Sequence, residues 1–383
     1  MTGVFRLVVA IDFAASERPT LGVEWEFALV DKTTRDLANC AEGLFERVHQ
    51  RAGDVPSLHT ELLRNTVEVV TRPCTTVVEA MRDLGESMEL VQQFTDELGV
   101  DLYSAGTHPF AQWSTQLLTP GPRYEELIER TQWWGRQMLI WGVHVHVGVT
   151  RREHVMPIVT SLLNQFPHLQ ALSASSPIWS GNDTGYASNR ALLFQQLPTA
   201  GLPFQFRRWE EYETFVDDHM RTGIIEHLND IRWDIRPSPR LGTVEVRICD
   251  GVSTVRELEA LVALIHCLVV DLSDRLEAGE TLPSMAPWFV QENKWRAARY
   301  GLDAVIILDA AGNERLVTED LEDLLVRLAP VADRLGCAAE LDAVREIPRR
   351  GASYQRQRQV AQATGGDLVA VVDSVVRELY DGR

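Results

Sequence analysis

The sequence predicts an α+β protein in which a large, mainly antiparallel sheet is backed by helices. Two observations carry this prediction: several segments alternate strictly between apolar and polar residues, and amphipathic helices with capping residues stand between them. Clean alternation is typical of antiparallel strands with one face on the core. The strands of a doubly wound parallel sheet would instead read as continuous apolar runs.

The first clear strand covers residues 20–30. Its two faces are an apolar set, Leu21, Val23, Trp25, Phe27 and Leu29, and a second set, Gly22, Glu24, Glu26 and Ala28. Residues 143–149 repeat the pattern, with valines at every second position and His144 and His146 between them. Residues 231–249 predict a hairpin around the turn SPRLG, with Arg232, Asp234, Arg236, Glu245 and Arg247 opposite its apolar residues. The first 18 residues predict an extra strand or a loose terminus, followed by a single domain over 19–383.

Residues 59–71 read as one further strand, closed by Pro73. Glu61 and Glu68 lie seven positions apart, so an unbroken strand would direct them to opposite faces. Either a bulge near residues 64–65 corrects the phase, or only one of the two acids belongs to a site. Glu68 lies in the more regular stretch and is favoured.

Helices are predicted where capping residues precede a 3.6-residue apolar period. Thr76 and Glu79 form a capping box at the start of a helix that Gly99 ends, and Thr254 and Glu257 begin a second long helix. Further helices fit 154–172, 319–335 and 366–380. Residues 180–190 and 283–300 are expected to be mobile loops.

The composition excludes several classes of partner and enzyme. The net charge of −18 makes nucleic acid and anionic membranes poor partners, and no segment reaches the ~18 apolar residues of a membrane span. The five cysteines are widely spaced without a C-x-x-C pair, which suits a reducing cytoplasm. Lysine occurs only at Lys32 and Lys294, and neither fits a Walker A loop or a kinase V-A-I-K strand. A nucleotide would therefore have to be held by metal ions and arginines.

The polar faces of the predicted strands carry the candidate metal ligands, which are Glu24, Glu26, Glu68, His146 and Glu245, with His144 a weaker candidate. Carboxylates crowded on one sheet face repel each other unless cations bind among them. Carboxylate oxygens suit Mg²⁺, and the same donors with a histidine are acceptable to Mn²⁺. The alternative to a metal site is a polar sheet face that only contacts solvent.

Basic side chains predict anion contacts at three further places. Arg190 follows a loop that also offers Tyr186, Ser188 and Asn189. The segment ENKWRAARYG carries Lys294, Arg296 and Arg299, which we expect to contact a nucleotide, although helical spacing would splay Lys294 and Arg299 apart. The third place is GASYQRQR, with Gln355 and Arg356. At each of these three places, the alternative is that the basic side chains are ordinary surface charges that contact only solvent.

Together these segments resemble the glutamate–cysteine ligase type 2 family, also called YbdK-like carboxylate–amine ligases. The matching motifs are GVEWEFALVD, HTELLRNTVEVVT, AGTHPF, HVHVGV, SGNDTGYASNR, LPTAGLPF, WDIRPSPRLGTVEVRICD and ENKWRAARYGLDA. The likeness runs from about Thr20 to the C-terminal helix and is poor only over residues 1–18.

The resemblance implies the glutamine-synthetase-like catalytic fold and a homodimer. It also implies that ATP phosphorylates the γ-carboxylate of glutamate and that the amine of cysteine displaces the phosphate. Its metal ligands would be Glu24, Glu26, Glu68, His146 and Glu245. Arg247 and Arg190 would meet phosphate or substrate, and Glu68 or a phosphate oxygen would take the amine proton.

Other functions remain open at this point. The amine acceptor can differ from cysteine, because the sequence encodes no recognisable thiol pocket. The HxH pair with carboxylates also fits a metal-dependent hydrolase. A guanidino kinase and a non-catalytic metal–nucleotide-binding protein are further alternatives.

Overall fold

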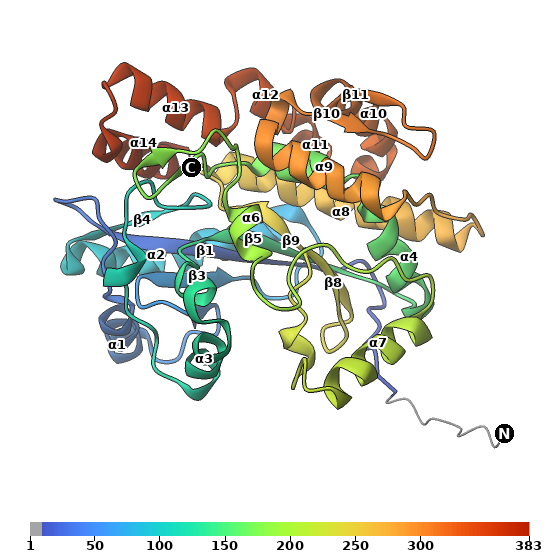
Figure 1. Ribbon diagram of the computed structural model, residues 1–383, viewed down its shortest axis with the longest axis horizontal. Helices are drawn as coiled ribbons and strands as arrows, with labels where there is room; N and C mark the ends of the chain where they lie inside the picture. The colour runs from blue at the N-terminus through green and yellow to red at the C-terminus, as the bar shows by residue number, and fades with distance from the viewer. Residues whose placement is uncertain (1–9, 383) are drawn as a thin grey trace.

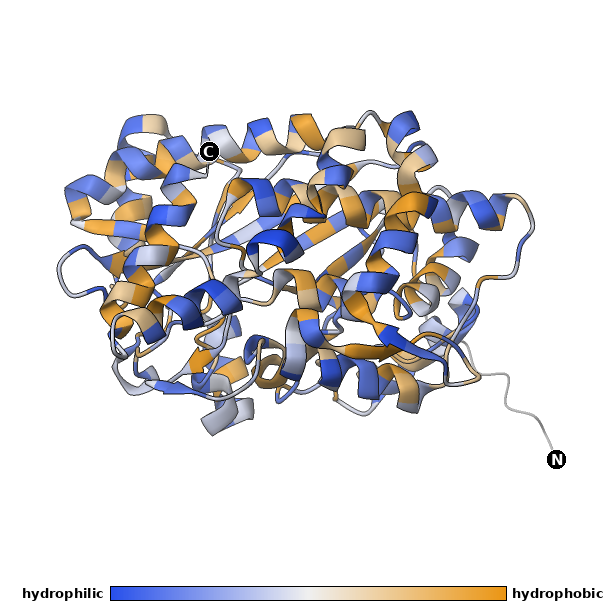
Figure 2. Ribbon diagram, turned by 90° about the horizontal axis from the view of Figure 1, so that it is seen from above, coloured by the Kyte–Doolittle hydropathy of each residue, from blue (hydrophilic) through white to orange (hydrophobic). Residues whose placement is uncertain are grey.

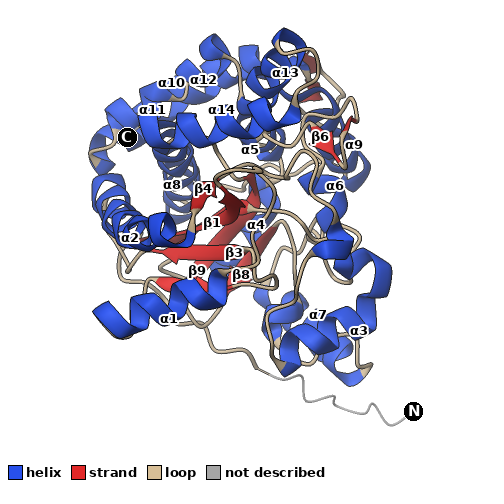
Figure 3. Cartoon of the chain, turned by 90° about the vertical axis from the view of Figure 1, so that its left-hand side faces the viewer, coloured by secondary structure: helices blue, strands red, loops and turns tan. Residues whose placement is uncertain are grey.

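The computed structural model describes residues 10–382, and its centre is a seven-stranded sheet surrounded by helices (Figures 1 and 3). The strand order is β2-β3-β1-β5-β9-β8, and β4 pairs with the second half of β1. The strands are β1 (Leu21–Asp31), β2 (Leu58–Thr60), β3 (Thr66–Val70), β4 (Val100–Tyr103), β5 (Gly142–Gly148), β8 (Ile235–Ser238) and β9 (Thr243–Asp250). All pairings within this sheet are antiparallel, so the predicted fold class is confirmed.

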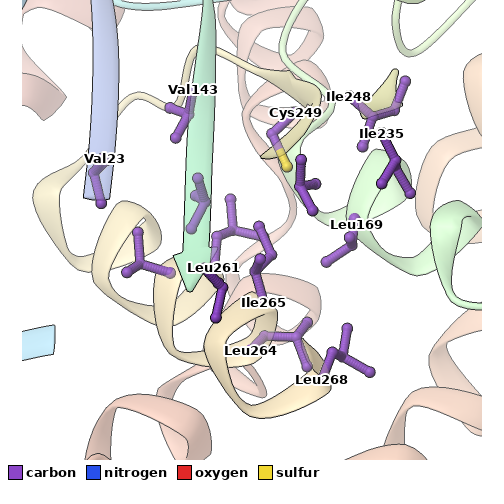
Figure 4. Close-up of a cluster of buried hydrophobic side chains, with 14 of the residues drawn as sticks. Val23, Val143, Leu169, Ile235, Ile248, Cys249, Leu261, Leu264, Ile265 and Leu268 are labelled. Atoms are coloured by element: carbon purple, nitrogen blue, oxygen red, sulfur yellow. The ribbon is translucent and has the colours of Figure 1, made fainter. Parts of the chain in front are cut away.

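One face of the sheet is apolar and packs on helices. Figure 4 shows side chains of β1, β5, β8 and β9 meeting those of α8 (Val255–Glu277) and α5 (Phe166–Ser173). Two more helices, α2 (Val77–Leu98) and α4 (Arg152–Leu162), also contact the sheet. The alternate residues of β1, such as Val23 and Trp25, are almost fully buried on this face. The helices mix hydrophobic and hydrophilic residues, as amphipathic helices do (Figure 2).

The capping signals placed the long helices correctly. The side chain of Thr76 accepts a hydrogen bond from the Glu79 N–H at the start of α2, and Thr254 does the same with Glu257 at the start of α8. Gly99 ends α2 in the left-handed conformation that favours glycine. The single helix predicted over 154–172 is instead two helices, α4 and α5, because the chain turns at residues 163–165.

The segment 59–71 is not one strand. It forms β2 and β3, which pair with each other in antiparallel fashion across the turn between them. Residues 283–300 were expected to form a mobile loop, but helix α9 (Pro287–Tyr300) covers most of them. Its first residue is a proline, which is favoured at the first helical position.

The remaining elements connect and cover this framework. They are α1 (Ala41–Ala52), η1 (Trp113–Thr115), α3 (Pro122–Arg136), β6 (Ile178–Trp179), β7 (Asn182–Asp183), α6 (Arg190–Phe194), α7 (Trp209–Arg221), η2 (Leu228–Asp230), η3 (Gly301–Asp303), β10 (Val305–Ile307), β11 (Glu314–Leu316), α10 (Val317–Leu335), α11 (Ala338–Ala343), α12 (Glu346–Arg350), α13 (Ser353–Ala363) and α14 (Leu368–Asp381). Helix α14 confirms the helix predicted over 366–380, and helix α10 confirms the one predicted over 319–335. Among residues 10–382, no helix is both long and apolar enough to cross a membrane.

Residues 1–9 of the predicted N-terminal extension lie outside the described residues. The part that follows is not a strand but packs on the domain. Phe13 meets Trp209 of α7 edge to face, and the Ala14 N–H donates to the Pro239 carbonyl at 2.9 Å. The division into an extension of 18 residues and one domain stays a prediction.

Candidate active site

The register of the sheet brings the predicted site residues into one cross-strand row on the face opposite the apolar core. Glu26 of β1 pairs with Glu68 of β3, and Glu24 of β1 pairs with His144 of β5. His146 pairs with Glu245 of β9, which in turn pairs with Arg236 of β8. Residues directly opposite each other on antiparallel strands share a face and have close Cβ atoms. The alternating polar residues therefore form one contiguous row, which we call the polar floor: Glu68, Glu26, Glu24, His144, His146, Glu245 and Arg236.

Glu24 lies at the centre of this floor and accepts hydrogen bonds from two histidines. Its carboxylate oxygens lie 2.9 Å from Nδ1 of His144 and 3.1 Å from Nε2 of His146. Burial opposes its ionisation, but the two histidine contacts outweigh burial and hold the pKa of Glu24 well below its usual range. Burial and the nearby Arg247 lower the pKa of His144, so its ring stays neutral and can act as a ligand.

Glu245 is buried between two arginines. Arg236 Nε lies 2.7 Å from one of its oxygens, and Arg247 forms an ion pair with the other. Burial alone would raise the pKa of Glu245, but Arg236 and Arg247 lower it far below the usual range. This acid is therefore a permanent anion, and the three groups fix one another in place.

The opposite end of the floor carries acids that form no ion pair with an arginine of residues 10–382. Burial is the largest cause that raises the pKa values of Glu26, Glu61 and Glu68, and the neighbouring carboxylates add to the rise for Glu68. Both Glu61 and Glu68 face this cluster. Both acids can face the same side because the break between β2 and β3 resets the two-residue period.

Three overlapping groups of donor atoms on this floor could each hold a metal ion, with their atoms within 4.8 Å of one another. The groups are Glu24, Glu68 and His144; Glu24, His146 and Glu245; and Glu26, Glu61 and Glu68. Carboxylate-rich groups with one histidine suit Mg²⁺ and Mn²⁺. Carboxylates that crowd together in a buried place repel each other unless cations bind among them. The donor set therefore fits hard divalent ions, and the five predicted ligands lie together.

A cavity of about 740 Å³ lies over this floor. Helix α3 lines part of the cavity. Its Tyr124 hydroxyl donates to the Thr60 carbonyl at 3.1 Å, and its Arg130 donates to the Ile224 carbonyl at 2.6 Å. An apolar wall includes Met138, Ile140, Phe194 and Leu197. Several lining residues that the sequence did not single out as site residues are Arg123, Tyr124, Asn229, Arg232 and Arg236.

Arg190 lines the same cavity from the start of α6 and is 3% exposed. One terminal nitrogen donates to the carbonyls of Arg247 and Ile248, whereas Nε has no hydrogen-bond partner among the described residues. Asp250 holds the preceding loop by accepting from Ser176 at 2.6 Å and from Ser188 at 2.9 Å. The predicted loop residues thus set the position of Arg190 rather than offering donors to the cavity.

Gly142 makes room for Arg190, because a Cβ at this position would overlap the guanidinium group. We expect Gly142→Ala to displace Arg190 and to lower turnover by roughly tenfold or more, since small misplacements of charged groups weaken transition-state contacts. Steady-state kinetics would measure this loss. Gly85→Ala is the matched control, because Gly85 lies in α2 with open space around its Cβ position. Equal turnover in the two variants would contradict this role of Gly142.

The basic cluster of α9 does not reach the cavity. Lys294 is buried and pairs with Asp234 at 2.6 Å. Arg296 pairs with Glu292 and Glu314, and Arg299 donates to the Gly185 carbonyl and lies over Tyr186. The fold gives these residues structural partners instead of a shared ligand, so we do not assign them to nucleotide binding. Arg356 likewise pairs with Glu257 and Glu378, and the Gln355 side chain accepts from the Ala352 N–H.

Lys294→Ala distinguishes the structural role from the predicted nucleotide contact. Removing one partner of a buried ion pair leaves the other charge unpaired, so we expect the free energy of unfolding to fall by about 3–5 kcal/mol. Arg296→Gln removes a more exposed pair and should cost less than about 1 kcal/mol. Urea unfolding measures both changes. A raised KM for ATP in Lys294→Ala without any loss of stability would restore the nucleotide assignment.

Comparison with known proteins places this geometry in a family. Residues 20–374 match the family model described as "Glutamate-cysteine ligase family 2 (GCS2)". A relative from Nocardioides sp. strain JS614 is 70% identical over 372 residues, which cover 97% of this chain and 99% of the relative. Its name is "Putative glutamate–cysteine ligase 2-3". A relative from Mycobacterium sp. strain JLS with the corresponding name 2-1 is 67% identical, covering 96% of this chain and 97% of its own.

Solved structures confirm the fold at low sequence identity. The glutamate–cysteine ligase of Francisella tularensis in complex with AMP superposes with a TM-score of 0.70 at 13% identity, covering 96% of this chain and 90% of that one. A bifunctional glutathione synthetase from Pasteurella multocida gives a TM-score of 0.68 at 13% identity, covering 95% of this chain and 53% of that one.

Proposed function

Because the chain belongs to the glutamate–cysteine ligase family 2 and is a ligase, we propose that it joins the γ-carboxylate of L-glutamate to the amine of L-cysteine at the expense of ATP. The observation that carries this proposal is the polar floor, where Glu24, Glu68 and Glu245 converge with two histidines and two arginines. The neighbour with bound AMP supports the use of ATP.

In the proposed reaction the γ-carboxylate of glutamate attacks the terminal phosphorus of ATP, and ADP leaves. The amine nitrogen of the acceptor then forms a bond to the carbonyl carbon of the phosphorylated γ-carboxyl group, while the bond between this carbon and the phosphate oxygen breaks. Phosphate leaves with the bonding electrons, and the ammonium proton passes to Glu68 or to a phosphate oxygen. Both steps bring anions together, so their rates depend on positive charge that is fixed in advance.

The side chains of this protein divide that work. The three groups of donor atoms on the polar floor would hold divalent ions. Bound Mg²⁺ or Mn²⁺ would supply positive charge that screens the glutamate carboxylate from the triphosphate. Arg247 is fixed by Glu245, and Arg190 is fixed by backbone carbonyls. Both guanidinium groups line the cavity, where they can bind anionic oxygens of phosphate or substrate.

Purified protein with ATP, Mg²⁺ and glutamate tests the proposal. We expect phosphate release that depends on glutamate and rises when cysteine is added, with γ-glutamylcysteine identified by mass spectrometry. Hydroxylamine in place of cysteine should trap the acyl phosphate as a hydroxamate. Glutamate-independent phosphate release would instead favour a hydrolase, and the absence of any turnover would favour a binding protein.

A further inference from the structure

A second chamber of about 670 Å³ lies beside the main cavity. Arg123 and Leu127 of α3 line both spaces, as do Asn229 and Arg232 from the segment before β8. The second chamber therefore borders the main cavity at these four shared residues. Sites of this volume accommodate molecules larger than one amino acid.

Four arginines and three acids line the chamber, so its fixed charge is positive on balance. Arg123, Arg130 and Arg240 are exposed, and none of them forms an ion pair with another residue of the described chain, 10–382. Such a cluster is unexpected in a protein with a net charge of −18. Unpaired arginines around one hollow are typical of a site for a carboxylate or phosphate.

Arg232 adds a fourth, less exposed cation at the junction of the two spaces. It lies 3.4 Å from Asp230, whose carboxylate also accepts the backbone N–H groups of Glu226 and His227. Burial lowers the pKa of Arg232, and the nearby positive charges of Arg123, Arg236 and Arg247 lower it further despite Asp230. A bound anion at the junction would relieve this repulsion.

The chamber is not purely cationic, because Glu126, Glu226 and Asp230 also line it. Charges of both signs suit a zwitterion, whose ammonium group needs acids and whose anionic group needs arginines. ATP carries no ammonium group that could pair with these acids. The mixed charge of the chamber therefore suits a zwitterion better than ATP.

We infer that this chamber binds the amine acceptor and that the acceptor carries an anionic group, a carboxylate or a phosphate, held by Arg123, Arg232 and Arg240. The inference rests on the proposed ligase function and adds the site and the chemical class of its second substrate. It also leaves room for acceptors larger than cysteine.

Pairs of acceptors that differ only in the anionic group test the inference. One pair is an α-amino acid with its C-terminal amide, and the other is phosphoethanolamine with ethanolamine. We expect the wild-type enzyme to prefer the anionic member of at least one pair by roughly tenfold or more in kcat/KM. The pair that shows this preference identifies the group as carboxylate or phosphate.

Arg123→Gln and Arg240→Gln probe the two ends of the chamber. We expect at least one of them to reduce the anionic preference to near unity, mainly through KM for the acceptor. Arg82→Gln is the matched control, because Arg82 is an exposed arginine of α2, which packs on the apolar face of the sheet. It should keep the full preference.

The outcomes separate the two proposals. Failure of the wild-type enzyme to form a hydroxamate from glutamate, ATP and hydroxylamine would overturn the ligase function itself. Hydroxamate formation with equal use of charged and neutral acceptors would overturn only the chamber assignment. The chamber assignment alone would also be overturned if both arginine variants raise KM for ATP and leave the acceptor preference unchanged.

Discussion

Glu24→Gln should lower glutamate-dependent phosphate release by about a thousandfold, which corresponds to about 4 kcal/mol of transition-state stabilisation. Glu24 belongs to two of the three candidate metal groups, so its neutralisation weakens both. Its side chain is 27% exposed, so the substitution should leave the fold intact. Turnover and Tm, measured together, separate loss of function from unfolding.

The control for this experiment is Glu89→Gln, which neutralises an exposed acid of α2 and should keep full turnover. Glu245→Gln is a less specific test than the sequence indicates. Glu245 compensates two buried arginines, so its loss should reduce both stability and turnover. If Glu24→Gln retains more than a tenth of wild-type activity, the polar floor is not the catalytic centre.

Divalent ions should raise the Tm of the protein, and they should do so more at pH 7.5 than at pH 5. The raised pKa values of Glu26, Glu61 and Glu68 mean that folding favours their protonated forms. Their contribution to stability is complete below the ordinary value near 4.5 and is lost as pH rises through the raised values. Metal binding replaces the protons and restores this stability at the higher pH.

A thermal-shift series with Mg²⁺, Mn²⁺ and EDTA measures this effect. At a hundredfold excess over Kd, ligand binding adds about 2.7 kcal/mol to the free energy of unfolding. NaCl at equal ionic strength is the control for screening, and Glu68→Gln should reduce the shift. A metal-induced shift that is equal at both pH values would show that these acids do not bind the ions.

The sequence alone predicted the sheet and the contents of its polar face, because a two-residue period in an antiparallel strand has one meaning. Glu24, His146 and Glu245 could be placed together for this reason. Glu61 could not be placed, since the turn that separates β2 from β3 leaves no signal as clear as a glycine or proline.

Residues outside the sheet were harder to predict. The spacing of Lys294 resembled an anion site, but its partner Asp234 is 60 positions away, and only the tertiary structure shows that the two pair. Arg123 and Arg240 were missed because α3 and the β8–β9 turn come together only in the folded chain. Local pattern predicts which face a residue occupies, whereas long-range packing decides what it meets.

The polar floor and the second chamber are built from different kinds of structure. The floor stands on central strands that are locked against α8, whereas α3, residues 226–232 and Arg240 form the chamber wall without belonging to the hydrogen-bond ladder around β1. Mutations in that wall can therefore accumulate without disturbing the ladder. If the chamber binds the acceptor as we propose, substitutions in its wall should change the choice of amine, and directed evolution of new amide products should begin there.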